Sequence, residues 1–152
     1  MNWLLNWGMA SRIVIFSLSA TSIWCLLSEF YGLCSMRSFT LAIFLPASAA
    51  LAALTVWAAA SGQPGGRRIA GLVTLGAVAG LVAAVAYDLF RIPFVFSKEL
   101  GLEGWIPHLR LFKVFPRFGA MILGQPIEQP RYSLAAHLIG WAYHFSNGLT
   151  FG

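Results

Sequence analysis

The residues best suited to chemistry in this sequence are an acid and a base that close a long apolar run. Asp88 and Arg91 stand three residues apart in the stretch AYDLFRIPF, and the nearest charge before them is Arg68. An ionisable side chain near hydrocarbon is costly unless paired, and residues three apart share one side of a helix. The pair therefore predicts either a membrane boundary or part of a buried polar site for ligand binding, proton movement or partner docking.

A second polar set lies near the end of the sequence, in a segment without formal charge. Four of its residues fall within roughly 60° of one another on a helix, namely His137, Trp141, His144 and Gly148. Histidine and asparagine in an apolar span need hydrogen-bond partners, so this face is expected to look into the bundle. Together the two segments predict a polar intramembrane seam of Tyr87, Asp88, Arg91, His137, His144 and Asn147.

Small residues lead up to the acid–base pair. Gly76, Gly80 and Ala84 recur every four residues. On a helix they fall within an arc of roughly 80° that also holds Arg91, with Asp88 at its edge. A stripe of small residues lets another helix approach closely. We therefore expect these three residues to form a helix-packing face.

Other chemistries have less support. His137 and His144 would be about 10.5 Å apart along one helix, too far to share an ion. A bis-histidine haem needs a second helix, for which His108 is the other candidate, and a haem held by one histidine stays open. Cys25 and Cys34 lack metal-ligand spacing, and no GxSxG or SxxK motif prepares a serine nucleophile. We expect no catalytic residue, metal or cofactor.

The elements that carry these residues must lie in a membrane. Of 152 residues, 59% are hydrophobic and only 10% are charged, against roughly 25% charged in a soluble domain. The apolar residues gather in blocks of about 20, the length of a membrane-spanning helix, whereas a barrel alternates over about 10 residues. The net charge is +5, but the basic residues are scattered as in loops beside lipid headgroups, so we expect no nucleic acid.

We predict one all-α transmembrane domain over residues 1–152 with four spans, at about 13–33, 38–61, 69–90 and 133–152. A kink is expected at Pro46 and a short turn at SGQPGGRR, and Pro93 is expected to end the third span. The last block stops without a polar anchor. Either the chain ends at the far membrane surface or the sequence is truncated at its C-terminus, and we favour truncation.

Region 92–131 mixes prolines, charges and aromatic rings, which is typical of an amphipathic or re-entrant segment. Arg110, Lys113 and Arg117 recur every three to four residues, with apolar side chains on the other faces. This predicts a basic helix lying on anionic lipid, with a docking surface for a partner protein as the alternative. The basic residues of this region and Arg37 outnumber those on the other side, which favours an N-terminus outside.

Three late motifs support a resemblance. The order of YDLFRIPF, FPRFGAMILG and HFSNGLTFG resembles uncharacterised bacterial integral membrane proteins that carry an HFxNGxxFG element in a late helix. The resemblance implies a helical protein of the bacterial inner membrane and implies no activity.

The leading functional interpretation is a non-catalytic integral-membrane subunit or scaffold. It would pack against partner membrane proteins or a second copy, within membrane lipids, because packing stripes and aromatic interfaces are abundant while catalytic sets are absent. A small transporter or channel is the alternative, with a polar pathway formed by Asp88, Arg91, His137, His144 and Asn147. A haem- or pigment-associated membrane protein is the third interpretation.

Overall fold

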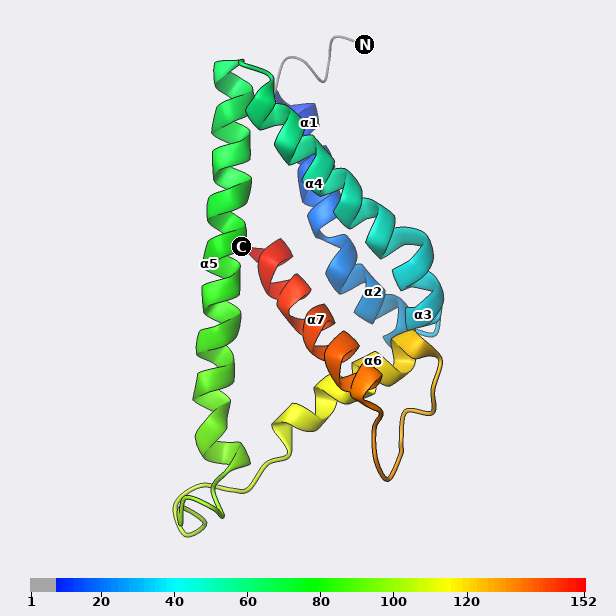
Figure 1. The fold of residues 1–152 in the computed structure, drawn as a ribbon, viewed down its shortest axis with the longest axis vertical. Helices are drawn as coiled ribbons and strands as arrows, with labels where there is room; N and C mark the ends of the chain where they lie inside the picture. Colours follow the sequence, from blue (N-terminus) through cyan, green and yellow to red (C-terminus); the bar gives the residue numbers. More distant parts are fainter. Residues whose placement is uncertain (1–7) are drawn as a thin grey trace.

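The computed structural model describes residues 8–152, and within that range every regular element is helical. Residues 1–7 of the predicted domain lie outside it. The elements are α1 (Met9–Ser19), α2 (Thr21–Phe30), α3 (Met36–Phe39), the π-helical turn η1 (Thr40–Phe44), α4 (Leu45–Ala60), α5 (Pro64–Val95), the 3₁₀ turn η2 (Leu111–Lys113), α6 (Val114–Leu123) and α7 (Leu134–Phe151). Figure 1 shows α5 upright on one side, α4 inclined away from it, and α7 between these two arms.

Two stretches of helix are long and apolar enough to cross a membrane. They are Met36–Ala60, with 25 residues, and Pro64–Val95, with 32 residues. Helices α1 and α2 meet the same test together and are bent by 46° at Ala20, so they supply a third span if the bent pair crosses as one. The part described is therefore all-helical, with two or three helices that are long and apolar enough to cross a membrane, which indicates membrane association.

The four-span count predicted from the sequence is not confirmed. The block 133–152 forms α7, but α7 is not among the helices apolar enough to span by themselves. His137, His144 and Asn147 lie within α7, and these polar residues lower its mean hydropathy. The prediction of a span rests on the lack of formal charge in this block, which is a weaker criterion than mean hydropathy.

The bend in the predicted first span has a local cause. Thr21 donates a hydrogen bond from its hydroxyl to the Leu18 carbonyl at 2.7 Å, and Ser22 donates to the Ser19 carbonyl at 3.4 Å. Hydroxyls that bond back to the preceding turn compete with the helix ladder and bend it. The sequence predicted an uninterrupted helix over 13–33, and the two hydroxyl residues account for the difference.

The second span starts with two polar caps. Ser35 accepts from the Ser38 amide at 3.2 Å, and the Glu29 carboxylate accepts from the Met36 amide. Close to Pro46 the helix widens into η1, where the Leu45 amide reaches back to the Thr40 carbonyl. A π turn commonly absorbs an irregularity within a helix, and this one lies where the sequence predicted a kink.

Helix α5 is longer at both ends than the predicted span 69–90. Pro64 stands in its first turn, where a missing N–H costs nothing, so the turn between α4 and α5 is shorter than SGQPGGRR. Pro93 lies inside the helix, which runs on to Val95, so the prediction that Pro93 ends the helix was wrong. A proline so near the C-terminus removes one bond to the Leu89 carbonyl, while the Phe96 amide still bonds Ile92 at 2.9 Å.

Small residues set the distance between α5 and α7. A Cβ built on Gly80 would overlap the carbonyl of Gly148, and one built on Gly76 would overlap Gly152. Gly148 in turn lies against Ala84. The stripe predicted for helix packing therefore contacts a second small-residue stripe within the same chain, and the backbones touch.

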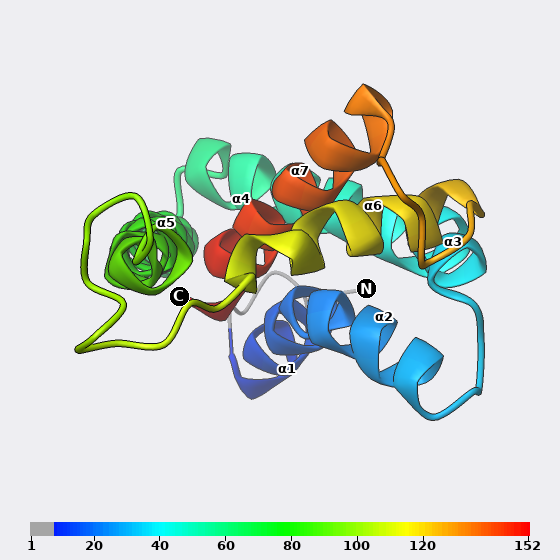
Figure 2. The same cartoon turned by 90° about the horizontal axis from the view of Figure 1, so that it is seen from below.

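Helix α6 crosses α7 in the same manner. A Cβ on Gly119 would overlap the Ala136 carbonyl, and one on Gly140 would overlap the Phe115 carbonyl. Figure 2, seen from below, shows α6 lying across α7 between α5 and α3. The region predicted to be interfacial thus contains a short helix that packs against the bundle.

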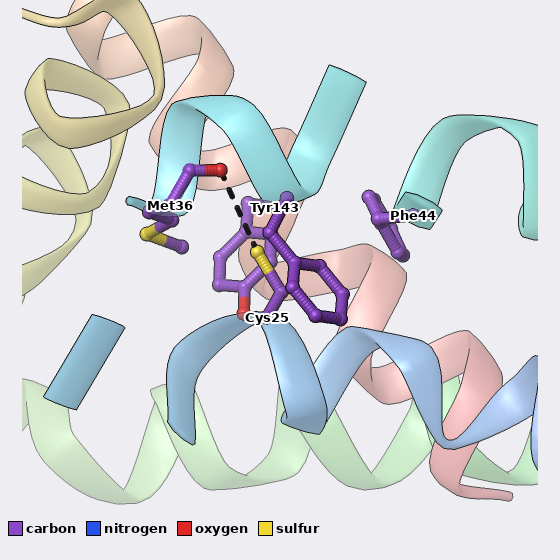
Figure 3. Close-up of a cluster of buried hydrophobic side chains, with 5 residues drawn as sticks. Cys25, Met36, Phe44 and Tyr143 are labelled. Atoms are coloured by element: carbon purple, nitrogen blue, oxygen red, sulfur yellow. Dashed lines mark hydrogen bonds between the residues drawn. The ribbon is translucent and has the colours of Figure 1, made fainter. Parts of the chain in front are cut away.

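The core lies where α2, α3, η1 and α7 meet. Its buried members are Cys25, Met36, Phe39, Phe44 and Tyr143. Figure 3 shows Cys25 among Met36, Phe44 and Tyr143, with its Sγ directed to the Met36 carbonyl at 3.8 Å. The Tyr143 hydroxyl donates to the Ser22 carbonyl at 2.7 Å, so this core holds α7 against α2 as well as α3.

Candidate functional site

The candidate site is centred on a hydrogen bond between two helices. His144 Nε2 on α7 lies 2.8 Å from Asp88 Oδ2 on α5, and both side chains are largely buried, at 15% and 13% exposure. The glycine contacts above bring α5 and α7 close enough for this bond to form. The direction of this hydrogen bond depends on the tautomer of the imidazole, because each ring nitrogen of a neutral histidine is either a donor or an acceptor.

Arg91 ties the pair to a third element. One terminal nitrogen lies 3.6 Å from Asp88 Oδ1, and the other donates to the Leu111 carbonyl of η2 at 3.3 Å. Its guanidinium also lies over the rings of Tyr87, at 4.8 Å from the centroid, and Phe115, at 5.2 Å. Cation–π contacts of this kind compensate a partly desolvated charge. Arg91 therefore joins α5 to the chain that precedes α6.

Aromatic side chains enclose the three polar groups. The Phe115 ring lies 4.4 Å from the His144 ring and 4.2 Å from the Trp141 ring, centroid to centroid. Beside them is a shallow groove of about 290 Å³ whose lining is apolar or aromatic apart from Asp88. This surrounding lowers the local dielectric, which strengthens the attraction between Asp88 and Arg91.

Several buried polar atoms at the site lack a hydrogen-bond partner among the described residues. They include Asp88 Oδ1, Arg91 Nε and Asn147 Oδ1. Asp88 Oδ1 still faces Arg91 as an ion pair, at a distance too long for a hydrogen bond. The arrangement provides one negative charge, one positive charge and one titratable imidazole in a cluster with spare hydrogen-bonding capacity.

The structure brings together part of the seam predicted from the sequence. Asp88 contacts both Arg91 and His144, and the ring of Tyr87 lies under the guanidinium of Arg91. Asn147 follows His144 on α7 and keeps its side-chain oxygen buried. His137 does not join them, because it lies on an exposed part of α7. Its ring packs edge-on against the Tyr132 ring there, with 6.2 Å between the ring centroids.

The basic residues predicted to face lipid divide into two groups. Arg110 is exposed in the loop before η2, outside any helix. Lys113 and Arg117 both pair with Glu128, which follows α6, and Lys113 does so at 3.7 Å. Helix covers only the later part of the predicted basic segment, and Glu128 partly neutralises it. Its contact with anionic lipid stays a prediction.

Sequence reasoning missed the aromatic wall of the site. Phe115 belongs to the segment predicted to lie on lipid, whereas its ring is 2% exposed and packs on His144. The available signal was the small pair Gly119–Ala120 one turn later, because small residues mark close helix contacts. Sequence reasoning also missed the 2.7 Å contact between the hydroxyls of Ser22 and Thr150, which joins α2 to α7.

Metal-binding residues do not converge at this site: among residues 8–152 no three His, Cys, Asp or Glu side chains are grouped as potential ligands. The fold and the site together define a class, a helical membrane-associated protein with a partly buried Asp–His–Arg cluster. Searches with family models, against curated proteins and against solved structures found no match to this chain.

Proposed function

We propose that this protein is a non-catalytic integral-membrane subunit or scaffold that packs against partner membrane proteins or a second copy. The observation that supports this best is that the two sides of α5 make different contacts. Its small-residue stripe and the ion pair of Asp88 and Arg91 are engaged within the chain. The opposite face presents large apolar side chains over most of the helix, for example Leu75, Val82 and Leu89, at 60–67% exposure.

In this proposal the polar cluster holds neighbouring helices in a fixed arrangement. The uncharged run from Ile69 to Tyr87 has the length of about 28 Å, close to the thickness of the hydrocarbon layer, which puts Asp88 and Arg91 near one boundary. There the cluster joins α5 to α7 and η2. A fixed arrangement of these helices is what a scaffold needs to present a constant outer surface.

We further propose that α7 is a fourth membrane-embedded helix, in a bacterial inner membrane. Its second half lies along the uncharged part of α5, from Ala84 to Gly76. Its polar side chains His144 and Asn147 are turned inward, as expected for a helix that cannot expose them to acyl chains.

The transporter interpretation has less support. The groove beside the cluster has an apolar and aromatic lining, and His137 is exposed away from Asp88. A hydrated pathway needs a continuous row of polar groups instead.

The experiment must separate contact with protein from contact with lipid. A photoreactive amino acid replaces Val82 or Leu89 on the exposed face of α5, and a third variant carries it at the buried Ala84. After irradiation of native membranes, Val82 or Leu89 should give a discrete protein adduct, identified by mass spectrometry, whereas Ala84 should crosslink only within the chain. Lipid adducts alone at both exposed positions, together with a monomer in native mass spectrometry, would contradict the proposal.

A further inference from the structure

A second groove, remote from the polar cluster, lies where the end of α4 meets the start of α5. It has a volume of about 670 Å³. One wall is Ala59 of α4, and the other is a stripe of α5 that runs from Arg67 through Gly71 to Val78. The stripe follows helical periodicity, so its members share one side of α5. Apart from Arg67 and the hydroxyl of Thr74, the lining side chains are apolar.

Arg67 gives the groove a charged end. Its guanidinium donates one hydrogen bond, at 3.2 Å, to the Gly62 carbonyl in the turn between α4 and α5. That bond holds the side chain over the turn and leaves further N–H donors of the planar group for another acceptor. The first turn of α5 adds the positive end of the helix dipole at the same place. The combination is complementary to a phosphate.

The position of the groove across the membrane is suited to a lipid. Helix α5 has 32 residues and is therefore about 48 Å long, well beyond the thickness of the hydrocarbon layer. Arg67 and Arg68 directly precede the uncharged run, so they stand at headgroup level. The apolar stripe from Ala70 to Val78 continues from there into the hydrocarbon, where an acyl chain would lie.

We propose that this groove binds one anionic phospholipid, with its phosphate on Arg67 and an acyl chain along the α5 stripe. A second copy of the chain is a poorer occupant. The five acidic residues of the sequence, namely Glu29, Asp88, Glu99, Glu103 and Glu128, all lie outside the α4–α5 turn and the groove lining. A copy inserted in the same direction therefore brings no carboxylate to the level of Arg67.

The test compares two lipids on the purified full chain. The protein in mild detergent is titrated with phosphatidylglycerol or phosphatidylcholine, and bound lipid is counted by native mass spectrometry. We expect one phosphatidylglycerol to bind at least about fivefold more tightly than phosphatidylcholine. Arg67→Gln should abolish this preference. Arg68→Gln makes the same charge change one residue away, outside the groove lining, and should keep it.

A second variant tests the groove itself. Gly71→Leu should fill the groove, and it should fold, because a Cβ at Gly71 meets no heavy atom within 4 Å. It should weaken the binding of both lipids at least about fivefold. Thr74→Leu serves the same purpose, and circular dichroism checks that each variant is helical.

Three results would overturn the proposal. An equal loss in the Arg67 and Arg68 variants would mean that general surface charge attracts the lipid. Unchanged binding in both groove-filling variants would place the lipid elsewhere. A dimer of the wild type that Gly71→Leu dissociates, while Arg67→Gln has no effect, would assign the groove to a second copy instead.

Discussion

Asp88 and His144 are 56 residues apart in the chain, and their side chains meet at 2.8 Å between α5 and α7. Arg91 completes the contact from the same helix as Asp88, at 3.6 Å. Because the carboxylate faces both an imidazole and a guanidinium in a largely buried setting, its removal affects two interactions together. Substitution of Asp88 is therefore expected to weaken the contact between these helices.

Asp88→Asn should destabilise the protein by about 2 kcal/mol, because it leaves Arg91 without its counter-charge in a partly buried site. The measurement is reversible unfolding in detergent, followed by circular dichroism. Glu128→Gln is the matched control, since Glu128 pairs with two cations but is 66% exposed. It should cost less than about 1 kcal/mol. Equal losses in the two variants would contradict a special role for the buried cluster.

Gly80→Ala should destabilise the contact between α5 and α7 by about 2 kcal/mol or more, because the added Cβ would overlap the Gly148 carbonyl. Gly71→Ala in the same helix is the control. Its Cβ meets no heavy atom within 4 Å, and alanine is favoured over glycine in a helix by roughly 1 kcal/mol. Thermal unfolding should therefore show a lower melting temperature for Gly80→Ala and a higher one for Gly71→Ala than for the wild type. A shared direction would mean that the close approach of the helices is not required.

Tyr143→Phe should cost about 1 kcal/mol, because it removes the buried hydrogen bond to the Ser22 carbonyl at 2.7 Å and leaves that carbonyl short of a donor. Tyr132→Phe removes a bond of the same length, from the Tyr132 hydroxyl to the Ile127 carbonyl, at the exposed surface. Water replaces that bond, so the change should be small. Denaturant unfolding measures the free energy of unfolding of both variants. A larger loss of stability in Tyr132→Phe than in Tyr143→Phe would contradict a structural role of the buried Tyr143 hydrogen bond.

Helix α5 should place its two ends on opposite sides of the membrane. In a background of Cys25→Ala and Cys34→Ser, a cysteine at Gly65 should react with a membrane-impermeant maleimide in intact cells. A cysteine at Glu103, in the exposed loop after α5, should react only after permeabilisation. When α1 and α2 cross as one span, this pattern corresponds to an N-terminus outside, as the distribution of basic residues predicts. Labelling of both positions from one side would mean that α5 does not cross.

How far the site could be predicted depends on whether its residues share a helix. Asp88, Arg91 and the stripe from Gly76 to Ala84 follow one another on α5, so helical periodicity alone places them on neighbouring faces. The sequence also proposed His144 as a partner, but it proposed His137 equally. Only the contact of α5 with the second half of α7, through Gly80 and Gly148, shows that His144 and not His137 meets Asp88.

The sequence by itself determined that the chain is helical and has segments apolar enough to cross a membrane, because hydrocarbon requires about 20 apolar residues per crossing and every backbone amide to be bonded within its own helix. Tertiary structure alone decided the burial of Phe115 against His144 and the choice of His144 over His137 as the partner of Asp88. Local propensity acts within one turn of helix, whereas these features depend on contacts between segments that are distant in the chain.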